Sequence, residues 1–279
     1  MSSPPPAPQP FPRSPGSSPE AGLTPSTLYV IATPIGNLGD ITHRALRTLG
    51  QIDALACEDT RRTRILYAAY EIPSPRTVLS YRQQNEEHAG RRIIGLLAEG
   101  LSVGLCSDAG YPGISDAGYR IISGALEKGY RVEVIPGAGA IEIALLSSGL
   151  PTSSFTFKGF PPKKPGARKR YLSMEKDSPH TLVFYDSPFR FQVLLRDAQE
   201  VLGNRQAAVC IELTKKFESI RRGSLAELAA AFEGKSIRGE VTVVIAGSNP
   251  KFRADESDAD SDPDCEPPNG SRDDAAPTS

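Results

Sequence analysis

The chain has 279 residues, a formal net charge of −1 and 39% hydrophobic residues, which is enough for one large domain or two ordinary ones. No apolar run reaches the roughly 18 residues of a membrane span, and the N-terminal stretch lacks the basic start and apolar core of a signal peptide, so we expect a cytoplasmic protein without a membrane partner. The four cysteines and three histidines are scattered without metal-ligand spacing, so the sequence predicts neither a metal site nor a disulfide framework.

The two ends of the chain differ in composition from its middle. Residues 1–26 contain nine prolines, and residues 254–279 contain nine acidic residues and one basic residue. Such segments bury too little apolar surface to offset their ordering entropy, so we expect a disordered Pro/Ser-rich tail at 1–26 and a disordered acidic tail at 250–279. Taking the −8 of the acidic segment from the total of −1 leaves +7 on the remainder, because residues 1–26 carry no net charge. A charge of +7 suits a polyanionic partner, although solvated basic side chains on helix faces explain it equally well.

Short apolar runs alternate with amphipathic segments through the first half of the chain. The predicted strands are 28–33, 52–57, 77–81, 103–107 and 132–136. The predicted helices between them are 42–50, 59–70, 88–100 and 115–128. Strands that alternate with helices of this length indicate βαβ units, so we expect an N-terminal α/β domain with a parallel sheet at 27–152.

The alternation changes after residue 149. Strand-like runs follow at 155–160, 181–186, 207–213 and 239–247, and the segment 220–225 also resembles a strand. Helical patterns fit 189–202 and 225–233. We therefore expect a C-terminal α/β domain with a mixed sheet at 153–249.

Three strands of the first half end in loops that are rich in glycine and proline. The loops read TPIGNLGD (33–40), SDAGYPGISD (107–116) and PGAGA (136–140). In open parallel sheets, ligands bind beyond the carboxyl ends of the strands, where glycine lets the backbone come close, so the three loops predict one small-molecule site. The GxGxxG spacing and the GxxxxGK[ST] phosphate loop are both missing, which argues against NAD in its usual mode and against a nucleoside triphosphate on a P-loop.

The phrase SDAGY occurs twice, at Ser107–Tyr111 and Ser115–Tyr119. The first copy would bring Gly110 close to a ligand. The second copy would supply Ser115 or Asp116 as the N-cap of the following helix.

A dense charged stretch, CEDTRRTRIL, occupies residues 57–66. Glu58 and Asp59 suit the positive end of a helix, and three arginines follow them. The residues alone leave two interpretations open: ordinary ion pairs on a solvated helix, or a row of side chains that contacts phosphates. The same choice applies to the basic stretch at 163–170 and to LTKKFES (213–219).

Seven motifs occur in one order along the chain. They are TPIGNLGD, CEDTRRT, SDAGYPGISDAGY, IPGAGA, GLPT, LVFYDSPFR and ELTKKFE…RRG. Together, over residues 27–248, they closely resemble the small-subunit ribosomal RNA (cytidine-2′-O)-methyltransferase I family of the tetrapyrrole methylase superfamily. The resemblance implies a two-domain fold, S-adenosylmethionine as cofactor, a homodimer, and 2′-O-methylation of a cytidine in small-subunit ribosomal RNA.

The resemblance also assigns residues to the cofactor. They are Pro34, Gly110, Tyr111, Ile114, Gly139, Ala140, Tyr185 and Leu213. The chain departs from the family pattern at Tyr111, where the family usually has threonine, and at Ala117, where it usually has proline.

The expected reaction needs a group that accepts a proton from a ribose hydroxyl, and a surface that binds RNA. The candidates for the first role are Glu58, Asp59 and Lys215, which lie beside basic runs. The candidates for RNA binding are Arg61, Arg62, Arg64, Lys163, Lys164, Lys169, Arg170 and Lys216. Two other functions stay open: a methylase that acts on a tetrapyrrole carbon, and a non-catalytic RNA-binding protein that keeps the fold.

Overall fold

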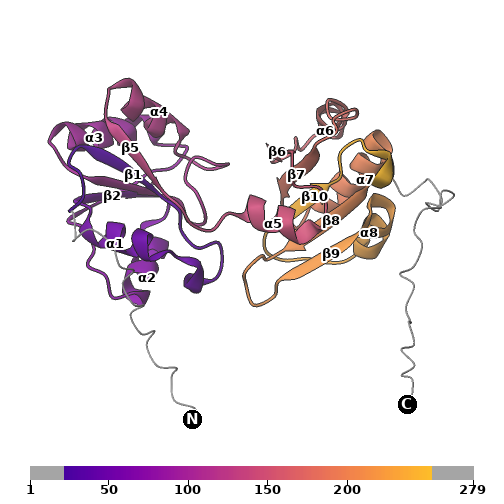
Figure 1. Cartoon of the computed structure of the whole chain (residues 1–279), viewed down its shortest axis with the longest axis horizontal. Coiled ribbons are helices and arrows are strands. Elements are labelled where there is room, and N and C mark those ends of the chain that lie inside the picture. Colours follow the sequence, from indigo (N-terminus) through magenta and orange to yellow (C-terminus); the bar gives the residue numbers. More distant parts are fainter. Residues whose placement is uncertain (1–21, 253–279) are drawn as a thin grey trace, which may run out of the picture. The chain divides into compact units, whose positions relative to one another are not determined.

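The computed structural model describes residues 22–252, which divide into two compact units (Figure 1). The first contains the described residues up to Ala140 together with Leu213–Lys216, and the second contains Ile141–Glu212 and the described residues from Phe217 onward. The sequence places the domain boundary after residue 152. Most of the two predicted tails lies outside the described residues.

The first unit is built on a five-stranded sheet in the order β3-β2-β4-β1-β5, with every pair parallel. The strands are β1 (Thr27–Ile31), β2 (Ala54–Cys57), β3 (Thr77–Ser80), β4 (Val103–Cys106) and β5 (Arg131–Ile135). The helices are η1 (Leu38–Asp40), α1 (His43–Gln51), α2 (Thr60–Ala69), α3 (Glu86–Ala98) and α4 (Tyr119–Glu127). Figure 1 shows α1 and α2 on one face of this sheet and α3 and α4 on the other.

Alternate residues of the central strands supply two separate cores. Tyr29 and Ile31 pack toward α1 and α2, whereas Leu28 and Val30 pack toward α3 and α4. Burial on both faces explains why these strands are continuous apolar runs in the sequence.

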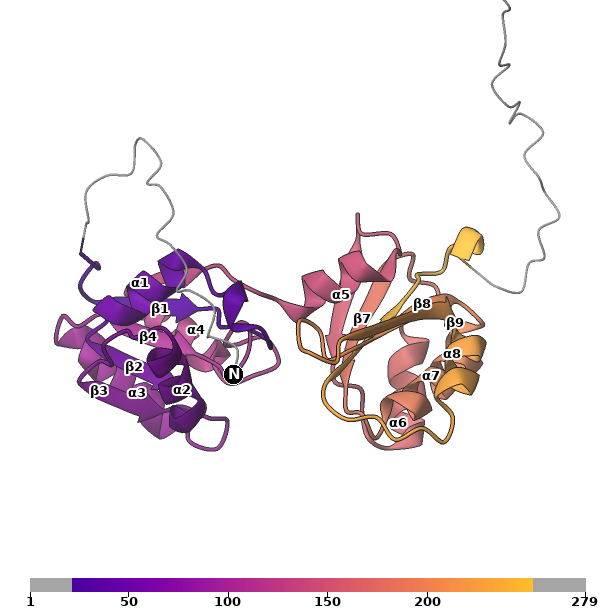
Figure 2. The ribbon, with the colours of Figure 1, turned by 90° about the horizontal axis from the view of Figure 1, so that it is seen from below.

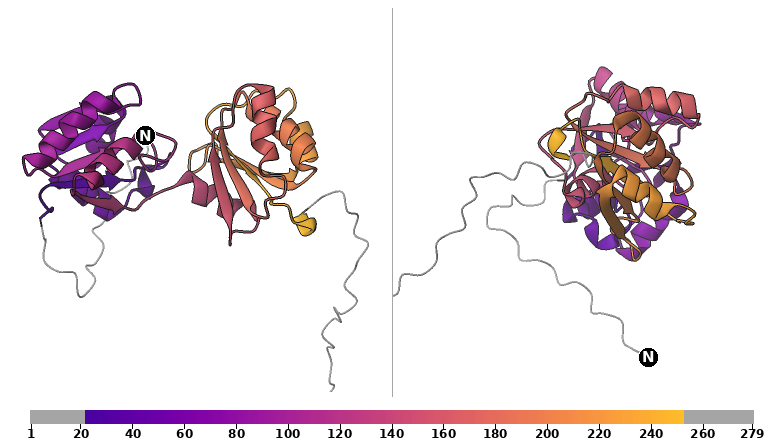
Figure 3. Two further views of the ribbon diagram at one scale, coloured as in Figure 1. Left: turned by 90° about the horizontal axis from the view of Figure 1, so that it is seen from above. Right: turned by 90° about the vertical axis from the view of Figure 1, so that its right-hand side faces the viewer.

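The second unit contains a mixed five-stranded sheet in the order β6-β7-β10-β8-β9. The strands are β6 (Phe155–Gly159), β7 (Thr181–Asp186), β8 (Gln206–Ile211), β9 (Ser219–Ser224) and β10 (Val241–Ile245). Only the β6–β7 pair is parallel, so the predicted parallel first sheet and mixed second sheet are both confirmed. The helices are α5 (Ala140–Ser148), α6 (Pro165–Ser173), α7 (Phe191–Leu202), α8 (Leu225–Phe232) and η2 (Pro250–Phe252). Figures 2 and 3 show α6, α7 and α8 together on one face of the sheet.

Two helices were not expected from the sequence. Helix α6 begins inside the basic stretch, with Pro165 in its first turn, where proline is tolerated because the first N–H groups have no intrahelical partner. Helix α5 begins at Ala140, the last residue of PGAGA, and its apolar residues carry no helical periodicity. Within residues 22–252, no helix is long and apolar enough to cross a membrane.

The predicted start of the helix after the SDAGY doublet is wrong. Helix α4 begins at Tyr119 with Gly118 as its N-cap, so neither Ser115 nor Asp116 caps it. Gly118 has φ +150° and passes so close to Gly113 that an added Cβ would lie 2.6 Å from the Gly113 nitrogen. The second copy therefore forms an additional turn packed on the first, in which the Gly113 N–H donates to the Ala117 carbonyl at 3.1 Å.

The first residues of the described chain are held in place. Leu23 packs against the core under α1 and α2, and the Thr24 N–H donates to the Tyr29 hydroxyl at 2.9 Å. The sequence assigns these two residues to the N-terminal tail.

Candidate functional site

The three glycine-rich loops meet at one edge of the first sheet. Strands β4, β1 and β5 are neighbours, so the loops that follow them leave the sheet side by side. Thr33 and Gly110 exchange two backbone hydrogen bonds of 2.9 and 3.0 Å, and the Thr33 hydroxyl donates to the Ser107 carbonyl at 3.2 Å. The first two loops are therefore joined by their backbones.

The third loop is held by Tyr111. Its hydroxyl accepts a hydrogen bond from the Gly137 N–H at 3.0 Å and donates to the Gly137 carbonyl at 3.4 Å. Gly137 has no room for a side chain, because an added Cβ would lie 2.9 Å from the Ala32 Cβ. Tyr111 thus connects the loop after β4 to the loop after β5.

This edge presents backbone and small side chains. Gly110 has φ +72°, a conformation that favours glycine, and Pro34, Gly139 and Ala140 are all half-buried. Backbone N–H and C=O groups in such an arrangement can bind the adenine, ribose and amino-acid parts of S-adenosylmethionine without charged side chains. The residues present therefore fit this cofactor.

Asp59 is the N-cap residue of α2. Its carboxylate accepts from the Arg61 backbone N–H at 2.9 Å and from the Arg61 guanidinium at 3.1 and 2.7 Å. Hydrogen bonds from Arg61 are the main reason that the pKa of Asp59 lies well below its usual value, and the same pair raises the pKa of Arg61. Asp59 is therefore a helix cap and an anchor for Arg61, and a weak proton acceptor.

Asp108, in the first SDAGY copy, connects the loop after β4 (107–116) to α2. It accepts from the Asp59 N–H at 3.0 Å and lies 3.5 Å from the Arg62 guanidinium. The sequence analysis did not single out Asp108. Only its position after β4, which neighbours β2, brings it to this helix.

The other two predicted catalytic residues, Glu58 and Lys215, also lie in the first unit. Glu58 is half-buried, and its backbone carbonyl accepts from the Arg82 guanidinium at 2.7 Å. Lys215 belongs to the segment Leu213–Lys216 of the first unit and lies over Gly36.

The predicted RNA-binding residues divide into paired and unpaired cations. Arg61 is 82% exposed but bound to Asp59, and Lys169 binds both carboxylate oxygens of Glu200 at 2.6 Å. Within the described residues, four others are exposed and form no ion pair: Arg64, Lys163, Lys164 and Arg170.

One arginine of the basic stretch is structural. Arg168 is 4% exposed, pairs with Asp197 at 2.7 Å and donates to the carbonyls of Pro162 and Lys163. It holds the loop before α6 against α7. One basic residue of this stretch therefore stabilises the fold, which the sequence pattern alone did not reveal.

In the second unit, Tyr185 lies in an aromatic group. Its ring centroid is 4.8 Å from that of Phe157, at an interplanar angle of 67°, and 5.8 Å from that of Phe160. Edge-on pairs of this kind fix ring orientation.

Comparison with known proteins decides the family. The model of the tetrapyrrole (corrin/porphyrin) methylases matches residues 27–229. The chain is 44% identical over 230 residues to ribosomal RNA small subunit methyltransferase I of Halalkalibacterium halodurans, covering 82% of this chain and 79% of that one. The chain belongs to the ribosomal RNA small subunit methyltransferase I family. The family predicted from the seven motifs is confirmed.

A second relative is ribosomal RNA small subunit methyltransferase I of Thermotoga maritima. It is 40% identical to this chain over 220 residues, which cover 79% of this chain and 98% of that one. Solved structures show the shared fold at lower identity. A uroporphyrin-III-C-methyltransferase from Thermus thermophilus aligns with a TM-score of 0.54 at 20% identity, covering 78% of this chain and 94% of that one. A diphthine synthase aligns with a TM-score of 0.58 at 17% identity, covering 79% and 89%. The chain is thus a methyltransferase with the tetrapyrrole methylase fold, and S-adenosylmethionine is its methyl donor.

Proposed function

We propose that this protein transfers a methyl group from S-adenosylmethionine to the 2′-hydroxyl of a cytidine in small-subunit ribosomal RNA. The observation that carries the proposal is 44% identity, over most of both chains, to a relative named for small-subunit ribosomal RNA methylation. The solved tetrapyrrole methylases are 20% identical to this chain or less. A likeness at that level shows the common fold and says nothing about a common substrate.

The cofactor supplies an electrophilic methyl group, and the protein's part is to orient it. We propose that eight residues bind the cofactor: Pro34, Gly110, Tyr111, Ile114, Gly139, Ala140, Tyr185 and Leu213. The joined loops of the first unit support this role, because backbone groups that are already hydrogen-bonded to each other lose little freedom when a ligand binds. Tyr111 positions the third loop through Gly137.

A ribose hydroxyl is a weak nucleophile, so a neighbouring group has to accept its proton. Asp59 is poorly suited, since its pKa is depressed by Arg61 and its carboxylate is already engaged in capping α2. We propose that Glu58 or Lys215 accepts the proton and that Asp59 positions Arg61.

We propose that RNA phosphates are bound by the exposed cations of the predicted set. In α2, Arg62 and Arg64 are exposed beside the loop edge of the first sheet, and Asp108 orients Arg62. Lys163, Lys164, Lys169, Arg170 and Lys216 would extend the contact surface. Their combined positive charge attracts a polyanion and releases counterions on binding.

We further propose that the protein acts as a homodimer in the cytoplasm. Sedimentation velocity of the full chain distinguishes a dimer from a monomer.

The decisive experiment supplies the purified full chain with labelled S-adenosylmethionine and unmodified small ribosomal subunits. The RNA is digested to nucleosides, and the labelled product is identified by mass spectrometry. We expect 2′-O-methylcytidine. Label on another nucleoside would overturn the assigned acceptor, and cofactor binding without any label in RNA would direct attention to tetrapyrrole acceptors.

A further inference from the structure

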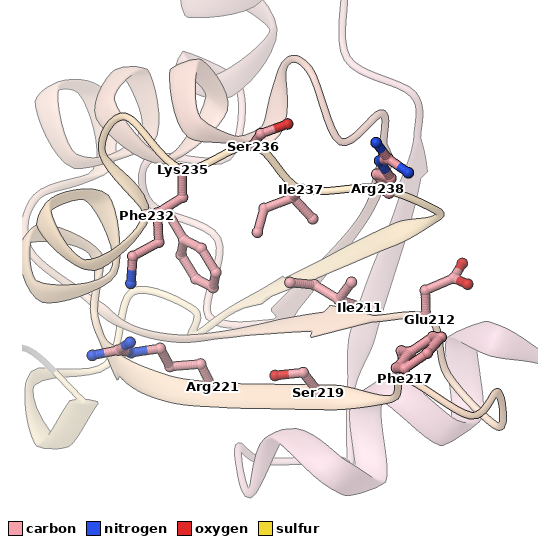
Figure 4. Close-up of a pocket in the computed structure, with 10 residues that line it drawn as sticks. All are labelled: Ile211, Glu212, Phe217, Ser219, Arg221, Phe232, Lys235, Ser236, Ile237 and Arg238. Atoms are coloured by element: carbon pink, nitrogen blue, oxygen red, sulfur yellow. The ribbon is translucent and has the colours of Figure 1, made fainter.

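The second unit contains a pocket of about 530 Å³ that has no part in the proposed function (Figure 4). Its volume lies within the range of small-ligand sites, roughly 300–1,000 Å³. Strands β8 and β9 form one wall, and the segment that follows α8 forms the other. The residues that line it are Ile211, Glu212, Phe217, Ser219, Arg221, Phe232, Lys235, Ser236, Ile237 and Arg238.

The centre of the pocket is apolar. Ile211 and Phe232 belong to the buried core of the unit, and Ile237 packs against that core. Figure 4 shows these three side chains in the middle of the pocket, with Phe217 at one end. Phe217 is 75% exposed, so its ring offers a flat apolar surface to a ligand.

The rim of the pocket is positively charged. It carries three cations, Arg221, Lys235 and Arg238, and one acid, Glu212. Among the residues that the structure describes, none of the three cations is in an ion pair. Figure 4 shows the charged ends of Arg221 and Lys235 at the same end of the pocket, opposite Phe217.

The walls are fixed by hydrogen bonds. Strand β9 is held in register by β8, with Ser219 opposite Ile211 and Arg221 opposite Val209. On the other wall, the Lys235 carbonyl accepts from the Gln192 side chain at 2.8 Å. The Glu212 carboxylate accepts from the Glu240 N–H at 3.0 Å, which ties the end of β8 to the start of β10. The pocket is therefore formed before a ligand arrives.

A cationic end, an apolar centre and an aromatic end match the parts of a nucleotide. Single-stranded nucleic acids are bound by this combination of phosphate-binding cations and rings on which bases stack. The Arg221 guanidinium lies 6.0 Å from the centroid of the Phe232 ring, but a purely apolar ligand would give none of the three cations an ionic partner. A free anion would make no use of the aromatic end.

We propose that this pocket binds one nucleotide of the RNA substrate outside the methylated residue, with its phosphate at Arg221 and Lys235 and its base on Phe217. The inference rests on the proposed function and extends it, because it gives the second unit a role in choosing the RNA. The pocket residues act in binding and take no part in the chemical step.

The test measures binding of the full chain to a fluorescein-labelled decamer of cytidine ribonucleotides, by anisotropy at several salt concentrations. For Arg221→Ala/Lys235→Ala we expect at least tenfold weaker binding. The slope of log affinity against log salt should fall by about 0.7, since the two cations share one phosphate and each neutralised phosphate of a single strand contributes about 0.7. For Phe217→Ala we expect binding weaker by about tenfold, with Phe217→Tyr close to wild type, because tyrosine keeps the stacking surface.

Two control variants are matched to these changes. Arg196→Ala removes an exposed arginine of α7, and Met174→Ala removes a 75% exposed apolar side chain; both lie outside the pocket and should bind the decamer like wild type. Pocket variants that bind as the controls do, or a wild-type chain that does not bind the decamer, would overturn the inference. Cytidine 5′-monophosphate that binds as tightly as the decamer would also overturn it, since the pocket would then serve a free nucleotide.

Methyl transfer to small ribosomal subunits separates this inference from the proposed function. If both hold, the pocket variants raise KM and leave kcat and the affinity for S-adenosylmethionine unchanged. A wild-type chain that binds the decamer through the pocket but transfers no methyl group would overturn the proposed reaction alone.

Discussion

The Tyr111 hydroxyl joins two of the three glycine-rich loops, because it accepts a hydrogen bond from the Gly137 N–H and donates one to the Gly137 carbonyl.

Removing this hydroxyl tests its role. For Tyr111→Phe we expect a Kd for S-adenosylmethionine about three- to tenfold higher, because a net hydrogen bond is worth about 1 kcal/mol. Isothermal titration calorimetry measures the change, and Tyr119→Phe, at a 73% exposed position of α4, is the matched control. Equal affinities for Tyr111→Phe and wild type would show that the loop holds its position without the hydroxyl.

Asp59 makes a second residue-level prediction, which concerns pH. Its folded-state pKa is lowered chiefly by Arg61, so the carboxylate stabilises the folded state above the unfolded pKa of about 3.9, and this stabilisation is lost as pH falls toward the folded pKa. Asp59→Asn keeps an N-cap oxygen and removes the charge. We expect its melting temperature to lie below that of wild type by a constant amount between pH 8 and pH 5, and the difference to shrink below about pH 4. A difference that is already changing between pH 8 and pH 5 would contradict this assignment.

At the scale of elements, α2 carries the arginines that the proposed function needs. Arg64 is exposed and, within residues 22–252, forms no ion pair, so it contributes little to the fold. We expect Arg64→Ala to weaken binding to small ribosomal subunits several-fold while leaving cofactor affinity unchanged, as measured by filter binding and calorimetry. Parallel losses of both affinities would show that the helix acts through structure.

Helix α8 depends on its capping box. The Ser224 hydroxyl accepts from the Glu227 N–H at 3.3 Å, and the Glu227 carboxylate accepts from the Ser224 N–H at 2.8 Å. The carboxylate also places a negative charge near the positive end of the helix. We expect Ser224→Ala to lower the free energy of unfolding by about 1 kcal/mol in urea titrations followed by circular dichroism. Ser224→Thr keeps the capping oxygen and should lose less; identical losses for the two variants would mean that packing of the buried serine, rather than the cap, is responsible.

Element positions were predictable wherever a local pattern exists. Every predicted strand has a counterpart, because short apolar runs bounded by glycine and proline are typical of buried strands. Helices α5 and α6 were missed, since the apolar residues of α5 show no helical periodicity and α6 lies in a basic run. The start of α4 was misplaced because Ser115 and Asp116 are good capping residues, but the packing of Gly118 on Gly113 decides where the helix begins.

At the scale of the whole molecule, charge is unevenly distributed along the chain. Residues 253–279, outside the described structure, contain nine acidic residues, and the family model already ends at residue 229. We expect deletion of 253–279 to leave methyl transfer intact and to strengthen RNA binding at low salt, because it removes repulsion of phosphate. Loss of transfer by a truncated chain with an unchanged circular dichroism spectrum would give this segment a role in the reaction.

The sequence by itself determined the family, the α/β class with its two kinds of sheet, and the three loops at the strand ends, because periodicity, glycine and proline act locally. Only the tertiary structure showed which polar residues contact each other. Asp108 reaches Asp59, and Tyr111 reaches Gly137, because sheet order makes neighbours of residues 49 and 26 positions apart. Burial likewise separated Arg168, which forms a buried ion pair with Asp197, from its exposed basic neighbours. The packing of the segment after α8 beside β8 and β9 gathered Phe217, Arg221 and Lys235 around one pocket. Such pairings depend on contacts between distant segments, which no local pattern records.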